Sequence, residues 1–147
     1  MVLVCSIFAG CDNTTSGDSS SKDSPASTVE PSSNELTIDE KTQSLLDEVE
    51  FPSMVNVKAE NLETYYGFAE EDVAEFSSYI CGSGAMPDEL GIFIAISDES
   101  AEKIKDALDK RIESQKTTYE DYTPNEMYKF DDCFVSVNGT SVTYAIC

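Results

Sequence analysis

Five cysteines carry the most reactive side chains of this sequence, and no histidine accompanies them anywhere in the chain. Catalytic serine and cysteine residues usually depend on a neighbouring imidazole base, so the composition excludes Ser-His-Asp and Cys-His catalysis. The missing histidine also removes the commonest metal ligand. Cys81, Cys133 and Cys147 lack the Cys-x-x-Cys spacing of a zinc site. We therefore expect neither a metal nor another cofactor.

The same three cysteines can form at most one disulfide, because three is an odd number. Free cysteine is among the most buried residue types, which favours buried free thiols. A disulfide between Cys81 and either Cys133 or Cys147 stays open as an alternative. A bridge between Cys133 and Cys147 is disfavoured, because the register predicted below for the last two strands places these residues on opposite faces.

Adjacent acids are the second candidate for chemistry, at Asp88-Glu89, Glu120-Asp121 and Asp131-Asp132. A glycan hydrolase needs two carboxyl groups roughly 5–9.5 Å apart in a cleft. Acidic side chains are mostly exposed, so solvated surface acids are the favoured interpretation. A small carboxylate-dependent hydrolase is kept as the alternative, and whether the chain is an enzyme is left open.

Three tyrosines, Tyr119, Tyr122 and Tyr128, lie with Pro124 in one acidic segment that we expect to connect a helix to the last strands. Their rings could line a groove for a glycan, a peptide or a cationic ligand. The favoured interpretation is that they pin a long loop to the core, since tyrosine suits half-buried positions. They are the tentative ligand-contact residues of the sequence.

The stretch Phe8-Ala9-Gly10-Cys11 resembles the bacterial lipobox, whose usual form is Leu-Ala-Gly-Cys. The resemblance implies that residues 1–10 are a partial lipoprotein signal peptide and that the Cys11 thiol carries a diacylglycerol. Ala9 and Gly10 are the small residues that cleavage of a signal peptide needs. A complete signal peptide has a basic start, and no Lys or Arg precedes Cys11. We therefore expect the natural start to lie further upstream.

Residues 11–50 are predicted to form a low-complexity, disordered tether. From Asp12 to about Asn34 the chain is mostly Ser, Thr, Asp and Asn, with almost no apolar residue. Such a segment cannot offset the entropy of ordering, which also argues against Cys11 as an ordinary core residue. A flexible coil of this length spans roughly 35 Å. A weakly amphipathic patch at 38–49 predicts a fraying helix near its end.

The formal charge of −20, from 29 acids against 9 bases, limits the partners. Phosphate backbones and anionic membranes repel such a chain, so nucleic acid is excluded and membrane contact needs an anchor. Acyl chains on Cys11 would supply it, since each buried methylene adds about 0.8 kcal/mol. We expect the protein on the outer face of the bacterial cytoplasmic membrane. An envelope protein or a glycan is the candidate partner, and the oligomeric state is undetermined.

A folded α+β domain is predicted for residues 51–147. Acids at 70–72 precede Val73, Phe76 and Ile80, whose helical spacing predicts a helix with one buried face. This helix and a second, described next, are expected to pack on a small, mostly antiparallel sheet.

The apolar run GIFIAI at residues 91–96 predicts a strand that is buried on both faces and therefore central. Ser97 or Asp98 can cap the helix that follows. The apolar stripe of this helix, formed by Ala101, Ile104, Leu108 and Ile112, predicts that it reaches about Lys116.

A β-hairpin is predicted at the end of the chain, with Asn138-Gly139 as a two-residue turn. In that register Val135 lies opposite Val142. The predicted core face holds Cys133, Val135, Val137, Val142, Tyr144 and Ile146.

The order of these patterns resembles the uncharacterised family named domain of unknown function 4358. The resemblance covers roughly residues 51–147 and rests on LETYYGF (62–68), DELGIFIA (88–95), YEDYTPNEMYKF (119–130), a charged amphipathic helix and the hairpin. It implies a lipoprotein of a Gram-positive anaerobe and identifies no catalytic residue. Members of the family often continue past the hairpin into another helix, so the resemblance implies a C-terminal truncation here.

The expected function is a lipid-anchored extracytoplasmic domain that binds or scaffolds a partner at the cell envelope without catalysing a reaction. This expectation rests on the lipobox-like stretch, the tether and the missing catalytic histidine. A carboxylate-dependent hydrolase of the cell envelope is the alternative.

Overall fold

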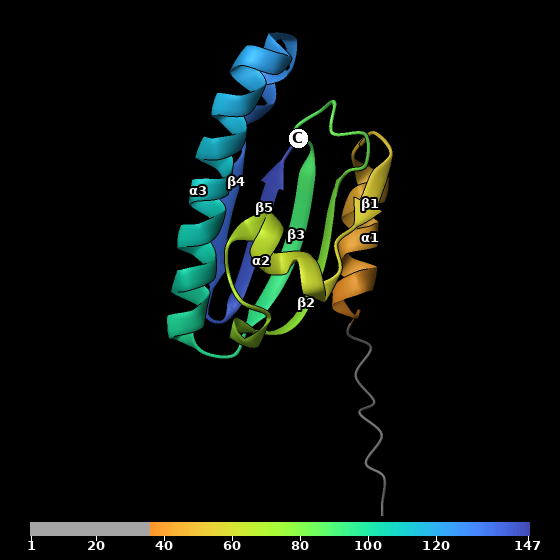
Figure 1. The fold of residues 1–147 in the computed structure, drawn as a ribbon. Coiled ribbons are helices and arrows are strands. Elements are labelled where there is room, and N and C mark those ends of the chain that lie inside the picture. The colour runs from red at the N-terminus through yellow and green to blue at the C-terminus, as the bar shows by residue number, and fades with distance from the viewer. Residues whose placement is uncertain (1–35) are drawn as a thin grey trace, which may run out of the picture. The chain divides into compact units, whose positions relative to one another are not determined.

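The structure, a computed structural model, describes residues 36–147 (Figure 1). Five strands of this range form one antiparallel sheet in the order β1-β2-β3-β5-β4. The predicted α+β fold with a C-terminal hairpin is confirmed. The elements are α1 (Ile38–Glu48), β1 (Met54–Asn56), α2 (Leu62–Tyr66), β2 (Val73–Cys81), β3 (Glu89–Ala95), α3 (Asp98–Tyr122), β4 (Phe134–Asn138) and β5 (Ser141–Ile146), with 3-10 turns at Ala59–Asn61, Glu70–Asp72 and Pro124–Phe130.

Cys11 and the predicted signal peptide at residues 1–10 lie outside the described residues. The lipid anchor and most of the tether therefore stay predictions.

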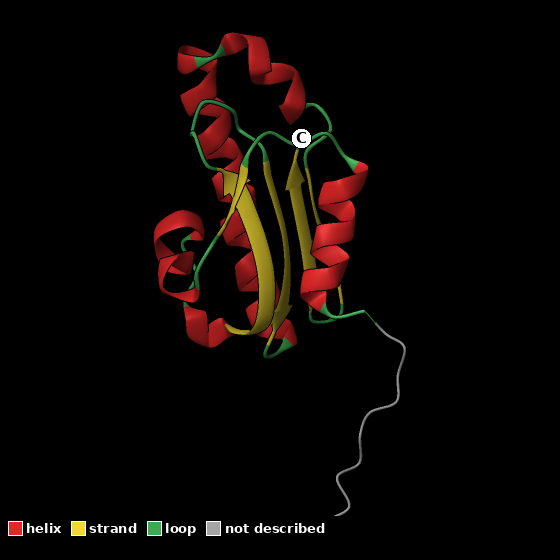
Figure 2. Ribbon diagram, turned by 90° about the vertical axis from the view of Figure 1, so that its right-hand side faces the viewer, coloured by secondary structure: helices red, strands yellow, loops and turns green. Residues whose placement is uncertain are grey.

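Helices cover both faces of the sheet (Figure 2). α2 and α3 lie on one face, and α1 lies on the other, against β2 and β3. β3 is the central strand, and all of its residues except Ile94 are buried, as the apolar run predicted. The main core fills the space between α3 and the sheet and includes Leu62, Phe93, Ile104, Leu108, Val142 and Ile146.

α1 begins with a capping box. The Thr37 hydroxyl accepts a hydrogen bond from the Glu40 N–H at 3.2 Å, and the Glu40 carboxylate accepts one from the Thr37 N–H at 2.8 Å. The Gln43 amide donates to the Tyr79 hydroxyl of β2 at 2.6 Å. This helix lies inside the range 11–50 that the sequence predicts as a tether, so the last part of that range is folded onto the sheet.

The helix predicted from Val73, Phe76 and Ile80 is wrong, because these residues belong to β2. A β-bulge between Val73 and Glu75 inserts one extra residue into the strand. Val73 and Phe76 therefore share a face although they are three residues apart, and Ile80 joins them through the ordinary period of two. All three pack against the core. The bulged strand thus reproduces the spacing of an amphipathic helix.

The register of the hairpin also differs from the prediction. Asn138 pairs with Ser141, and Val135 pairs with Tyr144, so the two turn residues are Gly139 and Thr140. The shift moves each partner by two positions, which leaves every side chain on its predicted face. The six predicted core-face residues all belong to the core or pack against it.

α3 is longer than predicted. The Ser97 hydroxyl caps it by accepting from the Ser100 N–H at 3.1 Å, as expected. The helix does not end near Lys116 but continues to Tyr122. The segment beyond Lys116 contains no glycine or proline until Pro124, whose ring disfavours helical backbone in the preceding residue.

Candidate functional site

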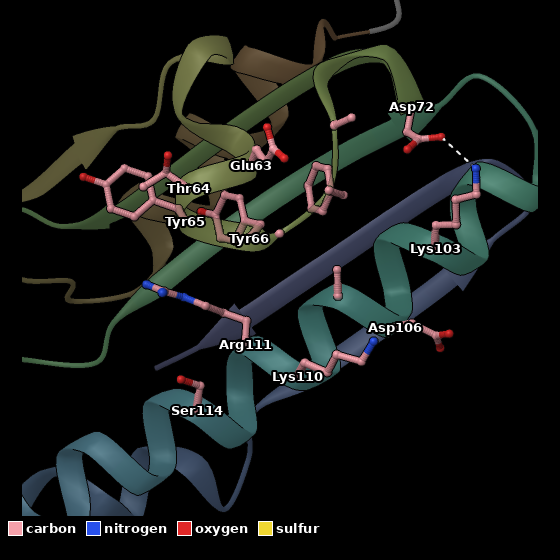
Figure 3. Close-up of a pocket in the computed structure, with 14 residues that line it drawn as sticks. Glu63, Thr64, Tyr65, Tyr66, Asp72, Lys103, Asp106, Lys110, Arg111 and Ser114 are labelled. Atoms are coloured by element: carbon pink, nitrogen blue, oxygen red, sulfur yellow. Dashed lines mark hydrogen bonds and ion pairs between the residues drawn. The ribbon is translucent and has the colours of Figure 1, made fainter.

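An open groove of about 730 Å³ separates α2 and the loop after it from α3 (Figure 3). The α3 side presents one stripe of the helix, at Lys103, Asp106, Ala107, Lys110, Arg111 and Ser114. The opposite wall consists of Glu63, Thr64, Tyr65, Tyr66, Gly67, Phe68, Ala69 and Asp72. Both walls are fixed to the same core, so the groove is part of the folded domain.

Two buried residues hold the short helix α2 in place. Leu62 and Tyr66 are buried four positions apart, which leaves Tyr65 between them exposed on the groove side. Gly67 ends the helix with a φ of +82°, a left-handed conformation that side chains with a Cβ seldom adopt. This turn sends the chain back along the groove, where Phe68 packs on the ring of Phe93.

A buried polar cluster around Glu89 holds Arg111, the member of the cluster that lines the groove. The Arg111 Nη2 donates to Glu89 Oε1 at 2.6 Å, and Arg111 Nε donates to Glu89 Oε2 at 3.3 Å. The Gln115 amide donates to Oε1 at 2.6 Å, and the Tyr144 hydroxyl donates to Oε2. Glu89 therefore has its charge paired and both oxygens occupied, which a buried carboxylate requires.

Tyr66 connects this cluster to the wall of the groove. Its ring lies 5.9 Å from the Arg111 guanidinium carbon, in the arrangement of a cation–π contact. Its hydroxyl shares a hydrogen bond of 2.5 Å with the Ser78 hydroxyl. Burial, followed by the negative charge of Glu89, raises the pKa of Tyr66 far above its ordinary value, so this phenol stays protonated.

A second cavity, of about 380 Å³, lies on the other side of Tyr65 and Arg111, which line both spaces. Its other walls include the β2–β3 loop, Gln115 and Tyr119. Cys81 also lines it and contacts the Ser83 hydroxyl at 3.3 Å. The pair Tyr65 and Arg111 thus marks the boundary between two neighbouring recesses.

The groove is lined by three cations and by three acids, Glu63, Asp72 and Asp106. Three of the nine Lys and Arg residues of the chain line it, including the only arginine. The Lys103 ammonium lies 3.4 Å from Asp72, and this pair closes one end of the groove. Lys110 makes no ion pair or hydrogen bond within residues 36–147. The groove therefore offers an uncommitted cation on an otherwise acidic surface.

The three predicted ligand-contact tyrosines do not share a site. Tyr119 is buried and lines the second cavity, where its hydroxyl donates to the carbonyls of Gly84 and Met86, both at 2.9 Å. Tyr122 and Tyr128 are exposed and line neither space. The predicted long connection is mostly the end of α3 and a 3-10 turn. Tyr119 belongs to α3 and ties down the β2–β3 loop, which is not the connection that the three tyrosines were expected to pin.

The paired acids also separate. Asp88 is buried and lies 2.6 Å from the Lys129 ammonium, whereas Glu89 points to Arg111 on the other side of the strand. Glu120, Asp121, Asp131 and Asp132 are exposed. The two buried carboxylates of residues 36–147 are thus each held by a cation, in an arrangement suited to structure.

Cys81, Cys133 and Cys147 are free thiols. The expected burial holds for Cys81, while Cys133 is half-buried and Cys147 is exposed. Within residues 36–147 no cluster of three or more Cys, Asp or Glu side chains has the arrangement of a metal site. None of the helices in that range combines the length and the apolar character needed to cross a bilayer.

Sequence reasoning did not select Tyr65, Lys110 or Arg111 as site residues. The available signal was weak: a single arginine on the border between the apolar stripe and the wet face of a helix. Only the packing of α2 against α3 brings Tyr65 next to Arg111.

Comparison with known proteins places this site inside a described family. The profile of the family described as Domain of unknown function (DUF4358) matches residues 47–147, which include both walls of the groove. The family resemblance drawn from the sequence is thereby confirmed. No curated protein and no solved structure matches the chain significantly.

Proposed function

The chain belongs to the family described as Domain of unknown function (DUF4358), and we propose that it is a lipid-anchored, extracytoplasmic domain that binds a ligand at the cell envelope. The observation that carries the binding role is the groove between α2 and α3. The anchor and the location are supported by the lipobox-like stretch that ends at Cys11. The ligand is held without chemical change, and the envelope is its source.

The groove has the features of a binding site rather than of a packing defect. Its volume lies in the range of small-molecule sites, and it combines an aromatic wall at Tyr65 with the charged side chains of Lys110 and Arg111. The bonds to Glu89 fix Arg111 on the groove wall before a ligand arrives, which lowers the entropic cost of binding.

The anchor is tested by a Cys11→Ala substitution in the native host, with the protein followed in membrane and soluble fractions. We expect Cys11→Ala to leave the membrane fraction, because the thiol is the point of lipid attachment. Cys147→Ala is the matched control and should stay with the membrane, since this cysteine is an exposed free thiol in the folded domain. Unchanged membrane retention of Cys11→Ala would reject the anchor.

The groove is tested with tryptophan substitutions in the lipid-free full chain. Ser114→Trp places a large ring in the groove, while Glu113→Trp places the same ring at an exposed position outside it. The chain has no tryptophan of its own, so fluorescence reports the state of each variant directly. We expect Ser114→Trp to lose binding to solubilised cell-wall and membrane polymers, and Glu113→Trp to keep it. Equal binding by both variants would reject the groove as the site.

A further inference from the structure

We infer that the Arg111 end of the groove holds an anionic oxygen group of the ligand, a carboxylate or a phosphate. This inference rests on the proposed binding function and adds the chemical class of the ligand. The supporting observation is that several hydrogen-bond donors that line the groove make no hydrogen bond within residues 36–147.

Only part of the Arg111 guanidinium is used in hydrogen bonds. Glu89 accepts from Nε and Nη2, and Nη1 makes no hydrogen bond within residues 36–147. The side chain is 19% exposed, and it lines both the groove and the second cavity. Figure 3 shows it extending from α3 toward Tyr65 and Tyr66. A guanidinium edge with free N–H groups matches the geometry of a carboxylate or a phosphate.

Glu89 makes this free edge rigid. Its two oxygens together accept from Arg111, Gln115 and Tyr144, and its side chain is 3% exposed. Arg111 cannot turn away without leaving a buried carboxylate unpaired, which is strongly unfavourable. The unused N–H groups therefore stay in place on a side chain that lines the groove, and a ligand needs little free energy to order them.

The neighbouring side chains are donors as well. Lys110 precedes Arg111 on the same wall and has no acidic partner within residues 36–147. The hydroxyls of Ser114 and Tyr65 line the same part of the groove and make no hydrogen bond within that range. The ion pair between Lys103 and Asp72 lies at the other end of the groove (Figure 3). One anionic group can thus meet several donors, and it shares the groove with the carboxylates of Glu63 and Asp106.

The overall charge of the chain limits which anionic ligands can bind in the groove. A chain of formal charge −20 repels free anions at a distance, so a small anion such as acetate or phosphate binds weakly and is titrated to high concentration. The ligand that fits is a larger molecule whose anionic group enters the Arg111 end while its remainder contacts the ring of Tyr65. Salt screens the long-range repulsion, and the probes below are therefore compared at constant ionic strength.

The test is a titration of the isotope-labelled, lipid-free full chain with inorganic phosphate, with acetate and with sodium chloride at equal ionic strength, followed by amide NMR shifts. We expect phosphate, acetate or both to shift the amides around residues 110–114 and 64–66, and chloride to leave them unchanged. Lys110→Gln should weaken this binding by about two- to fivefold, the effect of an exposed charge pair. Lys116→Gln removes the same charge outside the groove and should change nothing.

The phosphate and acetate titrations distinguish a phosphorylated ligand from a carboxylate ligand. A response to phosphate alone indicates a phosphorylated ligand, a response to acetate alone indicates a carboxylate, and either result supports the inference. No localised shift with either anion, or equal binding by Lys110→Gln and Lys116→Gln, would overturn it. The tryptophan pair Ser114→Trp and Glu113→Trp judges the groove independently of charge. A loss of envelope binding in Ser114→Trp without any anion response would keep the proposed function and reject only the anionic group.

Discussion

Arg111 of α3 and Glu89 of β3 form a largely buried, bidentate ion pair, with Nη2–Oε1 at 2.6 Å and Nε–Oε2 at 3.3 Å. The pair joins the core to the candidate site, because Glu89 is buried in the sheet while Arg111 lines the groove. The same contact therefore affects the stability of the fold and the geometry of the proposed binding site.

Glu89→Gln should destabilise the domain by about 3–5 kcal/mol, because it leaves the Arg111 charge largely buried without a partner. Urea unfolding of the full chain measures this loss. Asp131→Asn removes the same charge at an exposed position and should change the free energy of unfolding by less than about 0.5 kcal/mol. If the two variants were equally stable, the ion pair of Arg111 and Glu89 would not contribute to the stability of the domain.

Tyr144 should make the domain less stable in alkali. Burial, followed by the charge of Glu89, raises the pKa of Tyr144 well above its ordinary value. As the pH rises past about 10, the unfolded chain loses this proton first, so the free energy of unfolding falls. Tyr144→Phe should reduce the slope of that fall between pH 9.5 and 11, measured by urea unfolding. An unchanged slope would contradict the assignment.

Cys81 should ionise at a lower pH than Cys147. Burial raises the pKa of the Cys81 thiol, but the hydroxyl and N–H of Ser83 and the N–H groups of Met86 and Gly84 together outweigh it and lower the pKa. Cys147 is exposed as a residue, but partial burial of its thiol, followed by the charge of Asp88, raises its pKa. Iodoacetamide labelling read by peptide mass spectrometry gives the pH midpoint for each thiol separately, so differences in access do not interfere.

The Ser83→Ala variant is the control for this order. It removes one of the groups that lower the pKa of Cys81 and should move its labelling midpoint upward while Cys147 stays unchanged. A midpoint for Cys81 at or above that of Cys147 in the original chain would refute the prediction.

Gly67 should respond to substitution in an order opposite to that of side-chain size. A Cβ at this position meets no neighbour within 4 Å, so only the backbone conformation, with φ at +82°, matters. Gly67→Ala should cost roughly 1 kcal/mol, because alanine adopts left-handed backbone poorly. The larger Gly67→Asn should cost less, since asparagine tolerates that region. Thermal unfolding of the two variants decides between conformation and space as the cause.

The sequence was sufficient to predict those helices and strands for which a single local pattern indicates the element. The run at 91–96 predicted a central buried strand, which ends at Ala95 and leaves Ile96 exposed, and the stripe beginning at Ala101 predicted a helix face. β2 was misread because its bulge places Val73 and Phe76 three residues apart on one face. A bulge depends on the neighbouring strand, so no local spacing reveals it.

The candidate site was less predictable than the fold. Tyr119, selected from its sequence neighbourhood, proved to be a buried anchor of the β2–β3 loop. Arg111 and Tyr65 are 46 positions apart and meet only because α2 packs on α3, a tertiary contact without a sequence signature. Which N–H groups of Arg111 stay unused depends in turn on Glu89, which lies on β3 and accepts from Nε and Nη2.

An amide NMR shift map shows whether the groove between α2 and α3 is the ligand site. The isotope-labelled, lipid-free full chain is titrated with a solubilised envelope fraction from the native host. We predict that the perturbed amides gather in residues 63–69 and 103–114, the two walls of the groove. Perturbations gathered elsewhere, such as on the edge strand β4, or no perturbations at saturating concentrations, would rule out the groove as the ligand site.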